Sequence, residues 1–232
     1  MRKRNVLTIT VFSVACSFLS LSGLAQSGPD PYVQMGMEDI EKLLSDSPWS
    51  QTHDLGIVGG STAGMVMAGS FTVRLRSARQ IRVGLVRLRQ LKARYDKMND
   101  KDKAAFDEKN KPLIDCPACD ENYVVSLSPG PGSQGLFNGL KTMTLSDAKL
   151  NIQLLNDQGE SRELVHYAAP KAAGEDAVFF FSRLNQKGDP LVTPRTRSIN
   201  ISLGQKILGS TGPQNNFVFP VSRIVVNGQV SF

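Results

Sequence analysis

Residues 71–98 read FTVRLRSARQIRVGLVRLRQLKARYDKM, and the spacing of the apolar residues changes within this stretch. The first six residues alternate between apolar and polar or charged side chains, which predicts a half-buried strand. From residue 78 onward the spacing becomes that of an amphipathic helix. The apolar side of this predicted helix consists of Ala78, Ile81, Leu85, Leu88, Leu91 and Tyr95. The stretch therefore predicts a strand that leads directly into a long helix.

The opposite side of the predicted helix is strongly basic. The segment from Arg74 to Lys97 holds nine Lys and Arg residues against Asp96 alone, a local charge of +8. The cations on the side away from the apolar residues are Arg79, Arg82, Arg87, Arg89, Arg94 and Lys97. Like charges on one helix face repel one another unless something negative lies near.

Two interpretations of this basic side stay open. In the first, acidic residues elsewhere in the chain, or solvent and salt, offset the six positive charges. In the second, the six cations form a docking surface for an anionic lipid, an acidic envelope polymer or a protein partner. Nucleic acid is not expected as a partner, because the chain carries an export signal and no aromatic residues interleave the arginines.

The first 25 residues have the pattern of a signal peptide. Three cations at 2–4 precede an uncharged apolar run at 6–21, and Ala25 ends a site of small residues suited to cleavage. Removal of this segment lowers the formal charge from +6 to about +3, so the mature chain outside the basic segment carries about −5. Cys16 resembles the lipidated cysteine of a bacterial lipoprotein, but Ser13 replaces the usual leucine, and lipidation is not favoured. We expect an exported protein of the periplasm or cell envelope, or a secreted one.

Beyond the signal peptide the sequence predicts a tether and two parts. Residues 26–34 form the tether. Residues 35–120 form an α-rich part with one strand, a Gly-rich loop at 53–70 and the basic helix. Residues 121–232 form an antiparallel β domain. The fold class is therefore α+β, a helical N-terminal part followed by an antiparallel β-sandwich or small barrel.

The predicted elements outside residues 71–98 are short. Helices are expected at 37–44 and at 101–110, the second ended by Pro112. The segment 177–184 is expected to pair with 198–203, and an Asn227-Gly228 turn predicts a two-residue hairpin. The predicted strands of the β domain are 123–127, 151–155, 162–167, 177–184, 198–203, 223–226 and 229–232, with a hairpin expected between the second and third.

Cys116 and Cys119 are the two cysteines that remain after maturation. An oxidising compartment favours a local disulfide between them. A redox-active pair would need a stabilised thiolate at the start of a helix, whereas Asp120 follows at once and a strand is expected next. A zinc site would need two further ligands, for which only two histidines are available. A structural disulfide is favoured, and thiol-dependent redox chemistry or metal handling stays open as the alternative function.

The glycine cluster at 59–64 resembles two catalytic motifs and completes neither. A phosphate-binding P-loop needs a lysine after its last glycine, and no lysine lies between Lys42 and Lys92. A nucleophile elbow around Ser61 would need a glycine where Ala63 stands. We predict a loop here, and we predict no catalytic residue, metal ligand or cofactor elsewhere.

Three blocks of the sequence resemble a family of exported bacterial proteins of unknown function. They are the Ser-Pro-Trp at 47–49, the Arg-Leu-Arg-Ser-Ala at 74–78 and the Tyr-Val-Val-Ser-Leu at 123–127. The resemblance implies an envelope location and the layout given above, and it implies no site and no reaction. The sequence as a whole predicts an exported, non-catalytic envelope protein that binds or scaffolds an anionic partner.

Overall fold

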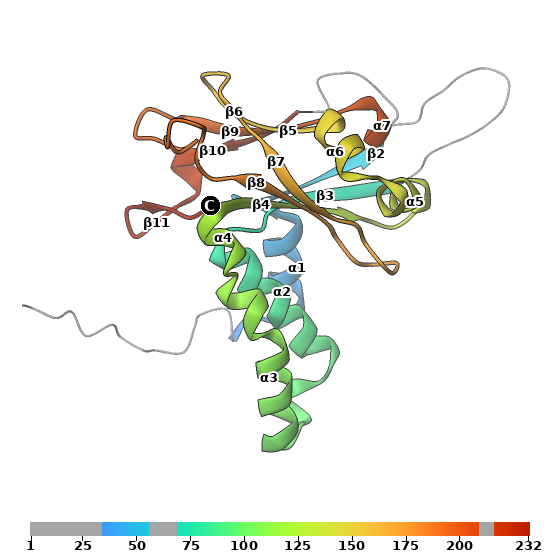
Figure 1. Cartoon of the computed structure of the whole chain (residues 1–232). Helices are drawn as coiled ribbons and strands as arrows, with labels where there is room; N and C mark the ends of the chain where they lie inside the picture. Colours follow the sequence, from blue (N-terminus) through green and yellow to red (C-terminus); the bar gives the residue numbers. More distant parts are fainter. Residues whose placement is uncertain (1–33, 56–68, 209–215) are drawn as a thin grey trace, which may run out of the picture. The chain divides into compact units, whose positions relative to one another are not determined.

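The central element of the fold is a six-stranded antiparallel sheet with the strand order β1-β2-β3-β4-β8-β7 (Figure 1). The computed structural model describes residues 34–55, 69–208 and 216–232. The strands of this sheet are β1 (Asp46–Ser47), β2 (Ser50–Leu55), β3 (Gly69–Leu75), β4 (Asn122–Pro129), β7 (Leu164–Ala168) and β8 (Ala177–Ser182). The predicted signal peptide, Cys16, most of the tether and most of the Gly-rich loop lie outside the described residues.

A second antiparallel sheet has four strands in the order β10-β9-β5-β6. Its strands are β5 (Ile152–Asn156), β6 (Ser161–Arg162), β9 (Ser198–Leu203) and β10 (Asn216–Pro220). The predicted pairing of residues 177–184 with 198–203 is wrong, because β8 lies between β4 and β7 whereas β9 lies between β5 and β10. The predicted hairpin at 151–167 is right only as far as Arg162, since β7 crosses into the other sheet.

The two sheets share one hydrophobic core. Alternate residues of each strand point into it, as expected when one face of an antiparallel sheet is buried. The core residues from the six-stranded sheet include Phe71, Leu75, Tyr123, Val125, Phe179 and Phe181, and those from the four-stranded sheet include Leu154, Ile199, Ile201, Phe217 and Phe219. Both sheets are open, so the α+β class and the antiparallel sheets are confirmed, and the barrel alternative is not.

Short helices that the sequence did not reveal close this core. They are α5 (Gln134–Thr142), α6 (Leu145–Asn151) and α7 (Gln205–Leu208). Leu136, Leu140 and Ile207 reach from them into the core between the sheets. Each helix is nine residues or shorter, too short for a clear apolar period.

Two further helices pack together on the other face of the six-stranded sheet. They are α1 (Met37–Ser45) and α2 (Arg79–Lys92), with Ile40, Leu43 and Ile81 buried between them. Gly84 permits the close approach, because a Cβ there would lie 2.9 Å from Leu43 Cδ2.

The face of the sheet beneath α1 is polar. Three side chains from β2 and β3 donate to the last carbonyl groups of α1, which have no partner within the helix. The bonds are Ser50 Oγ to Leu43 O (2.8 Å), Arg74 Nε to Leu44 O (2.6 Å) and Thr52 Oγ1 to Ser45 O (2.9 Å). We call this side of the sheet the outer face.

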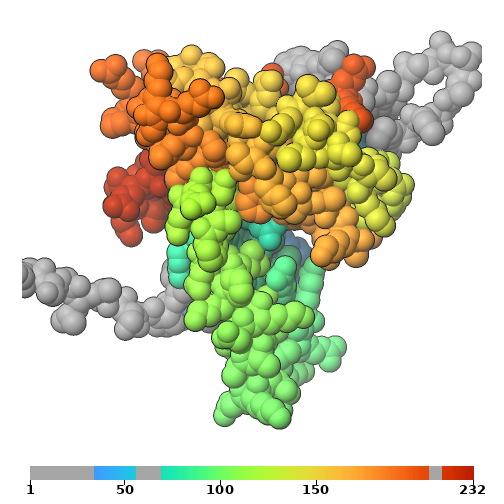
Figure 2. Space-filling model, viewed as in Figure 1, coloured from blue at the N-terminus to red at the C-terminus, as the bar shows by residue number. Residues whose placement is uncertain are grey.

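The helical region after α2 differs from its prediction at both boundaries. The predicted helix at 78–98 ends at Lys92, because Arg94 adopts a left-handed conformation with φ 54° before the single turn η2 (Tyr95–Lys97). The next helix, α3 (Asp100–Asp115), continues past Pro112 and is capped by Cys116. It leads into α4 (Ala118–Glu121) and then into β4. Most side chains of α3 are exposed, and Figure 2 shows them in green.

The predicted boundary at residue 121 does not divide the sheet. The α-rich part contributes β1, β2 and β3 rather than one strand, and β3 pairs with β4 across the boundary. The described residues all belong to one compact unit. The predicted Asn227-Gly228 hairpin is confirmed, with β11 (Val225–Val226) paired to β12 (Gln229–Val230) after the short turn η4 (Val221–Arg223). None of the helices in the described ranges has the length and apolar character needed to cross a membrane.

Candidate functional site

Three of the six predicted docking cations are bonded to oxygen atoms of the protein itself. Arg82, Arg87 and Arg89 all project from α2. Their bonds are Arg82 Nη1 to Asp115 O (3.5 Å), Arg87 Nε to Met35 O (3.1 Å) and Arg89 Nη1 to Asn110 Oδ1 (2.8 Å). The three side chains therefore hold α3 and the segment before α1 against α2. They do not all point into solvent as a single docking face would require.

The other three predicted cations lie near the ends of α2. Arg79 is exposed in its first turn. Arg94 and Lys97 are exposed beyond its last turn, close to Lys92, which is also exposed. The structure therefore separates the predicted set into three arginines that join helices, Arg79 at the start of α2, and an exposed basic end after α2.

The acceptors of the joining arginines are uncharged oxygens, so these hydrogen bonds do not neutralise the positive charges. Asp115 offers its main-chain carbonyl to Arg82, and a cation is favoured at the carbonyl end of a helix such as α3. Burial, followed by repulsion from Arg79, lowers the pKa of Arg82, while Asp120 and Asp115 act in the opposite direction. Arg82 Nε is buried without a hydrogen-bond partner among the described residues.

A second group of arginines lies on the outer face of the sheet, and the sequence analysis did not identify it as a site. Arg74 Nη1 lies 3.3 Å from Asp176 Oδ1, and Arg76 Nη1 lies 3.8 Å from Asp176 Oδ2. The exposed fractions of the three side chains are only 12%, 20% and 12% for Arg74, Arg76 and Asp176. Two largely buried guanidinium groups therefore share one carboxylate.

The positive charge of Arg89 on α2 also acts on this group. The pKa of Arg76 is lowered chiefly by burial and further by the charges of Arg89 and Arg74, with Asp176 opposing the shift. The pKa of Arg74 is also lowered by burial, against the effect of Asp176. We call Arg74, Arg76, Arg89 and Asp176 the arginine cluster. With three positive charges and one negative charge, its formal charge is +2.

Ser126 lies on the outer face beside the arginine cluster. It stands directly opposite Arg74 on β3 and Val178 on β8, and residues paired in this way point to the same side of a sheet. Ser126 is fully buried, and its Oγ has no hydrogen-bond partner in the described part of the chain. A buried hydroxyl without a partner is uncommon in folded proteins and calls for an explanation.

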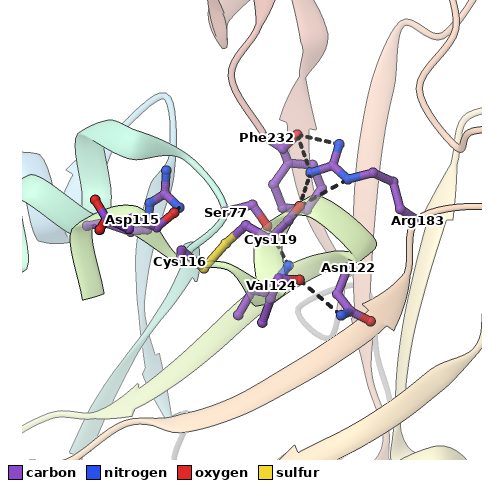
Figure 3. Close-up of a disulfide and its surroundings, with 10 residues drawn as sticks. Ser77, Asp115, Cys116, Cys119, Asn122, Val124, Arg183 and Phe232 are labelled. Carbon is purple, nitrogen blue, oxygen red and sulfur yellow. Dashed lines mark hydrogen bonds between the residues drawn. A yellow bond between two sulfur atoms is a disulfide. The ribbon is translucent and has the colours of Figure 1, made fainter. Parts of the chain in front are cut away.

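The predicted disulfide is present, with an S–S distance of 2.07 Å between Cys116 and Cys119 (Figure 3). Cys119 is only 7% exposed and packs against Val124 and Val178 on the outer face. Arg183 donates to the carbonyl of Cys119 at 2.9 Å. A short helix, α4, does begin between the two cysteines, contrary to the prediction. The burial of Cys119 and its apolar packing nevertheless favour a structural role over redox chemistry.

The two histidines lie on different faces of the six-stranded sheet. His53 packs edge-on against Phe217 at 4.7 Å, and burial lowers its pKa. His166 contacts Phe180 at 5.1 Å. Within residues 34–55, 69–208 and 216–232, no three His, Cys, Asp or Glu residues are grouped so that they could hold a metal ion. The glycine cluster at 59–64 lies outside the described residues.

One signal in the sequence could have indicated the arginine cluster. Arg74 and Arg76 alternate with apolar residues in FTVRLR, so both must lie on the same face of a strand.

No family model, curated protein or solved structure matches the chain. The resemblance to exported bacterial proteins of unknown function therefore stays a prediction.

Proposed function

We propose that the protein is an exported, non-catalytic binding protein whose basic segment, residues 74–97, binds an anionic partner. The observation that carries the proposal is the poor compensation of charge in this segment. Arg74 and Arg76 share Asp176, while Arg82, Arg87 and Arg89 are bonded to uncharged oxygens. Positive potential of this kind attracts anionic surfaces and polymers.

Partner binding would use two regions of the segment. Lys92, Arg94 and Lys97 form the exposed basic end of α2 and are suited to the first encounter. The arginine cluster lies in a less exposed place, where an ionic contact is less screened by water and salt. The arginines that join α2 to its neighbours hold both regions in a fixed arrangement.

Co-sedimentation tests this proposal with two anionic partners. The probes are vesicles of phosphatidylglycerol, with vesicles of phosphatidylcholine as the neutral reference, and long-chain polyphosphate on beads. The native protein should bind the anionic vesicles, the polyphosphate beads or both at low salt, and should bind the neutral vesicles much less. Each well-placed cation near an anionic membrane contributes about 1 kcal/mol.

A matched pair of variants shows whether the basic end is responsible. The triple change of Lys92, Arg94 and Lys97 to Glu should remove most of the binding, because it reverses the three exposed positive charges of the basic end. The fold should stay intact, because none of these side chains donates a hydrogen bond to a described residue. The control changes three exposed lysines of α3 to Glu and alters the total charge equally. Its positions are Lys101, Lys109 and Lys111. Equal loss in both variants would contradict a localised binding region, and no binding by the native protein would contradict the proposal.

A further inference from the structure

We infer that the arginine cluster is a binding site for one doubly charged oxoanion, such as a phosphate monoester or free sulfate. The inference rests on the proposed function and deepens it, because it assigns to the anionic partner a chemical group and a place. The site is separate from the exposed basic end of α2. It is formed by Arg74 of β3, by Arg76 in the turn that follows β3, by Arg89 of α2 and by Asp176, the residue before β8.

The guanidinium group of Arg76 supplies the open donors. An arginine carries five N–H donors in a planar fork. The contact of Arg76 with Asp176 measures 3.8 Å, which is too long for a hydrogen bond, and the described residues accept no hydrogen bond from this guanidinium. The side chain is 20% exposed, so part of it can be reached from solvent. Arg76 is therefore positioned to donate two parallel bonds to an incoming oxoanion.

The charge of the cluster selects a dianion. Arg74, Arg76 and Arg89 carry three positive charges, and Asp176 offsets one of them. A carboxylate ligand would leave the cluster at +1, whereas a phosphate monoester carries about −1.5 to −2 charges at neutral pH and would bring it close to neutral. Since burial and mutual repulsion already lower the pKa of Arg76, a dianion would relieve an existing unfavourable charge.

Ser126 provides a second and independent observation. Its buried hydroxyl lies on the same face as Arg74 and has no described partner. Arg74 of β3 reaches Asp176, which precedes β8, and β4 lies between those two strands, so the ion pair passes over the strand that carries Ser126. A bound oxoanion, or a water molecule that it holds, would supply the acceptor that this hydroxyl lacks.

Asp176 holds two arginines of the site together before an oxoanion binds. It keeps Arg74 and Arg76 close together in the empty site and so reduces the repulsion between them. The incoming oxoanion does not need to displace it, because the open donors belong to Arg76. Replacement of Asp176 by Asn removes the one negative charge of the cluster and should therefore strengthen oxoanion binding.

The test is isothermal titration calorimetry of the full mature chain with inorganic phosphate and sulfate, and with acetate as the monoanion. We expect phosphate and sulfate to bind at least tenfold more tightly than acetate. Arg76→Gln should weaken phosphate binding at least tenfold, and Arg76→Lys should restore only part of it, because lysine keeps the charge and loses the fork. Arg195→Gln removes an exposed arginine elsewhere and should have no effect.

Circular dichroism melting shows whether each variant is folded. If Arg76→Gln does not fold, Asp176→Asn serves instead, and its phosphate affinity should rise.

Two further binding measurements show whether a lipid or a soluble molecule carries the phosphate group. One uses vesicles that contain phosphatidic acid, and the other uses glycerol 3-phosphate in solution. Stronger binding of the vesicles than of the soluble monoester would assign the group to a lipid headgroup, and equal affinity for the two would assign it to a soluble or polymer-borne monoester.

Several results would overturn the inference without touching the proposed function. Absence of phosphate binding, equal affinity for acetate, or full binding by Arg76→Gln would each remove the oxoanion site. If polyphosphate or anionic vesicles still bind in that case, the exposed basic end of α2 is sufficient and the proposed function stands. Loss of both kinds of binding would reject the two together.

Discussion

Arg74 Nη1 lies 3.3 Å from Asp176 Oδ1, and this ion pair connects β3 with the residue before β8 across the intervening strand β4. The same guanidinium donates through Nε to Leu44 O at the end of α1. Arg74 therefore ties together the sheet, the loop before β8 and the first helix. It also brings a second arginine, Arg76, to the same carboxylate.

Replacement of Asp176 by Asn should destabilise the fold and make its stability depend on sulfate. The change leaves two largely buried guanidinium groups without their carboxylate, which should cost about 1–3 kcal/mol in the free energy of unfolding. Urea denaturation measures this loss. Added sodium sulfate should recover more stability in the variant than in the native protein, beyond its general effect on folding. Unchanged stability without sulfate would show that the ion pair contributes little.

The side-chain caps on α1 should contribute measurable stability. Ser50→Ala removes the donor to Leu43 O at a fully buried position, so the free energy of unfolding should fall by about 1–3 kcal/mol. Ser45→Ala is the matched control, because its Oγ bonds to Glu41 O on an exposed surface and its loss should change stability by less than about 0.5 kcal/mol. Equal effects in urea denaturation would mean that the polar outer face is not what holds α1.

Some of these relationships could be predicted from the sequence, and the reasons are local. The alternation in 71–76 predicted β3, the apolar spacing predicted α2, and Asn227-Gly228 predicted the last hairpin. Each of these predictions depends on residues that are close together in the sequence. The disulfide between Cys116 and Cys119 was predictable for the same reason, since only two residues lie between the two cysteines.

The pairing of Arg74 and Arg76 with Asp176 could not be predicted, because it depends on the order of strands. Asp176 is 102 residues from Arg74 in the sequence, and they meet only because β4 and β8 are neighbours. The sequence offered β9 as an equally apolar partner for β8, and that pairing is wrong. Arg79, Arg82, Arg87 and Arg89 lie on α2 as predicted, whereas Arg94 and Lys97 lie beyond its end. Helical spacing could not reveal that α3 packs against this side and accepts hydrogen bonds from Arg82 and Arg89.

Removal of the disulfide should leave the protein folded. Replacement of both Cys116 and Cys119 by Ser removes a ring closed over three residues, and loop closure of that length contributes about 2 kcal/mol or less. The thermal midpoint should fall slightly, and binding of anionic vesicles should persist. If binding disappears while circular dichroism shows an intact fold, a thiol-dependent function would replace the one proposed.

The free energy of unfolding should depend on pH through the ionisation of the Tyr167 hydroxyl. Its hydroxyl donates to Leu140 O at 2.5 Å, and burial raises its pKa to about 12. Its unfolded-state pKa is about 10, so the stability it contributes is complete below that pH and is lost as the pH rises toward 12. Between about pH 10 and 11.5 the native protein should lose stability more steeply than Tyr167→Phe. Identical slopes in urea denaturation would show that this hydroxyl ionises as freely as in the unfolded chain.

The most direct test of the account is the dissociation constant for polyphosphate measured over a range of salt concentrations. For the native protein, log Kd should rise linearly with log salt, because cations of the basic segment release bound counterions from the polymer. The variant with Lys92, Arg94 and Lys97 changed to Glu should bind more weakly and show a smaller slope, while the control variant of α3 keeps most of the native slope. A native protein that fails to bind polyphosphate even at the lowest salt, or whose binding does not respond to salt, would contradict the claim that this segment recognises an anion.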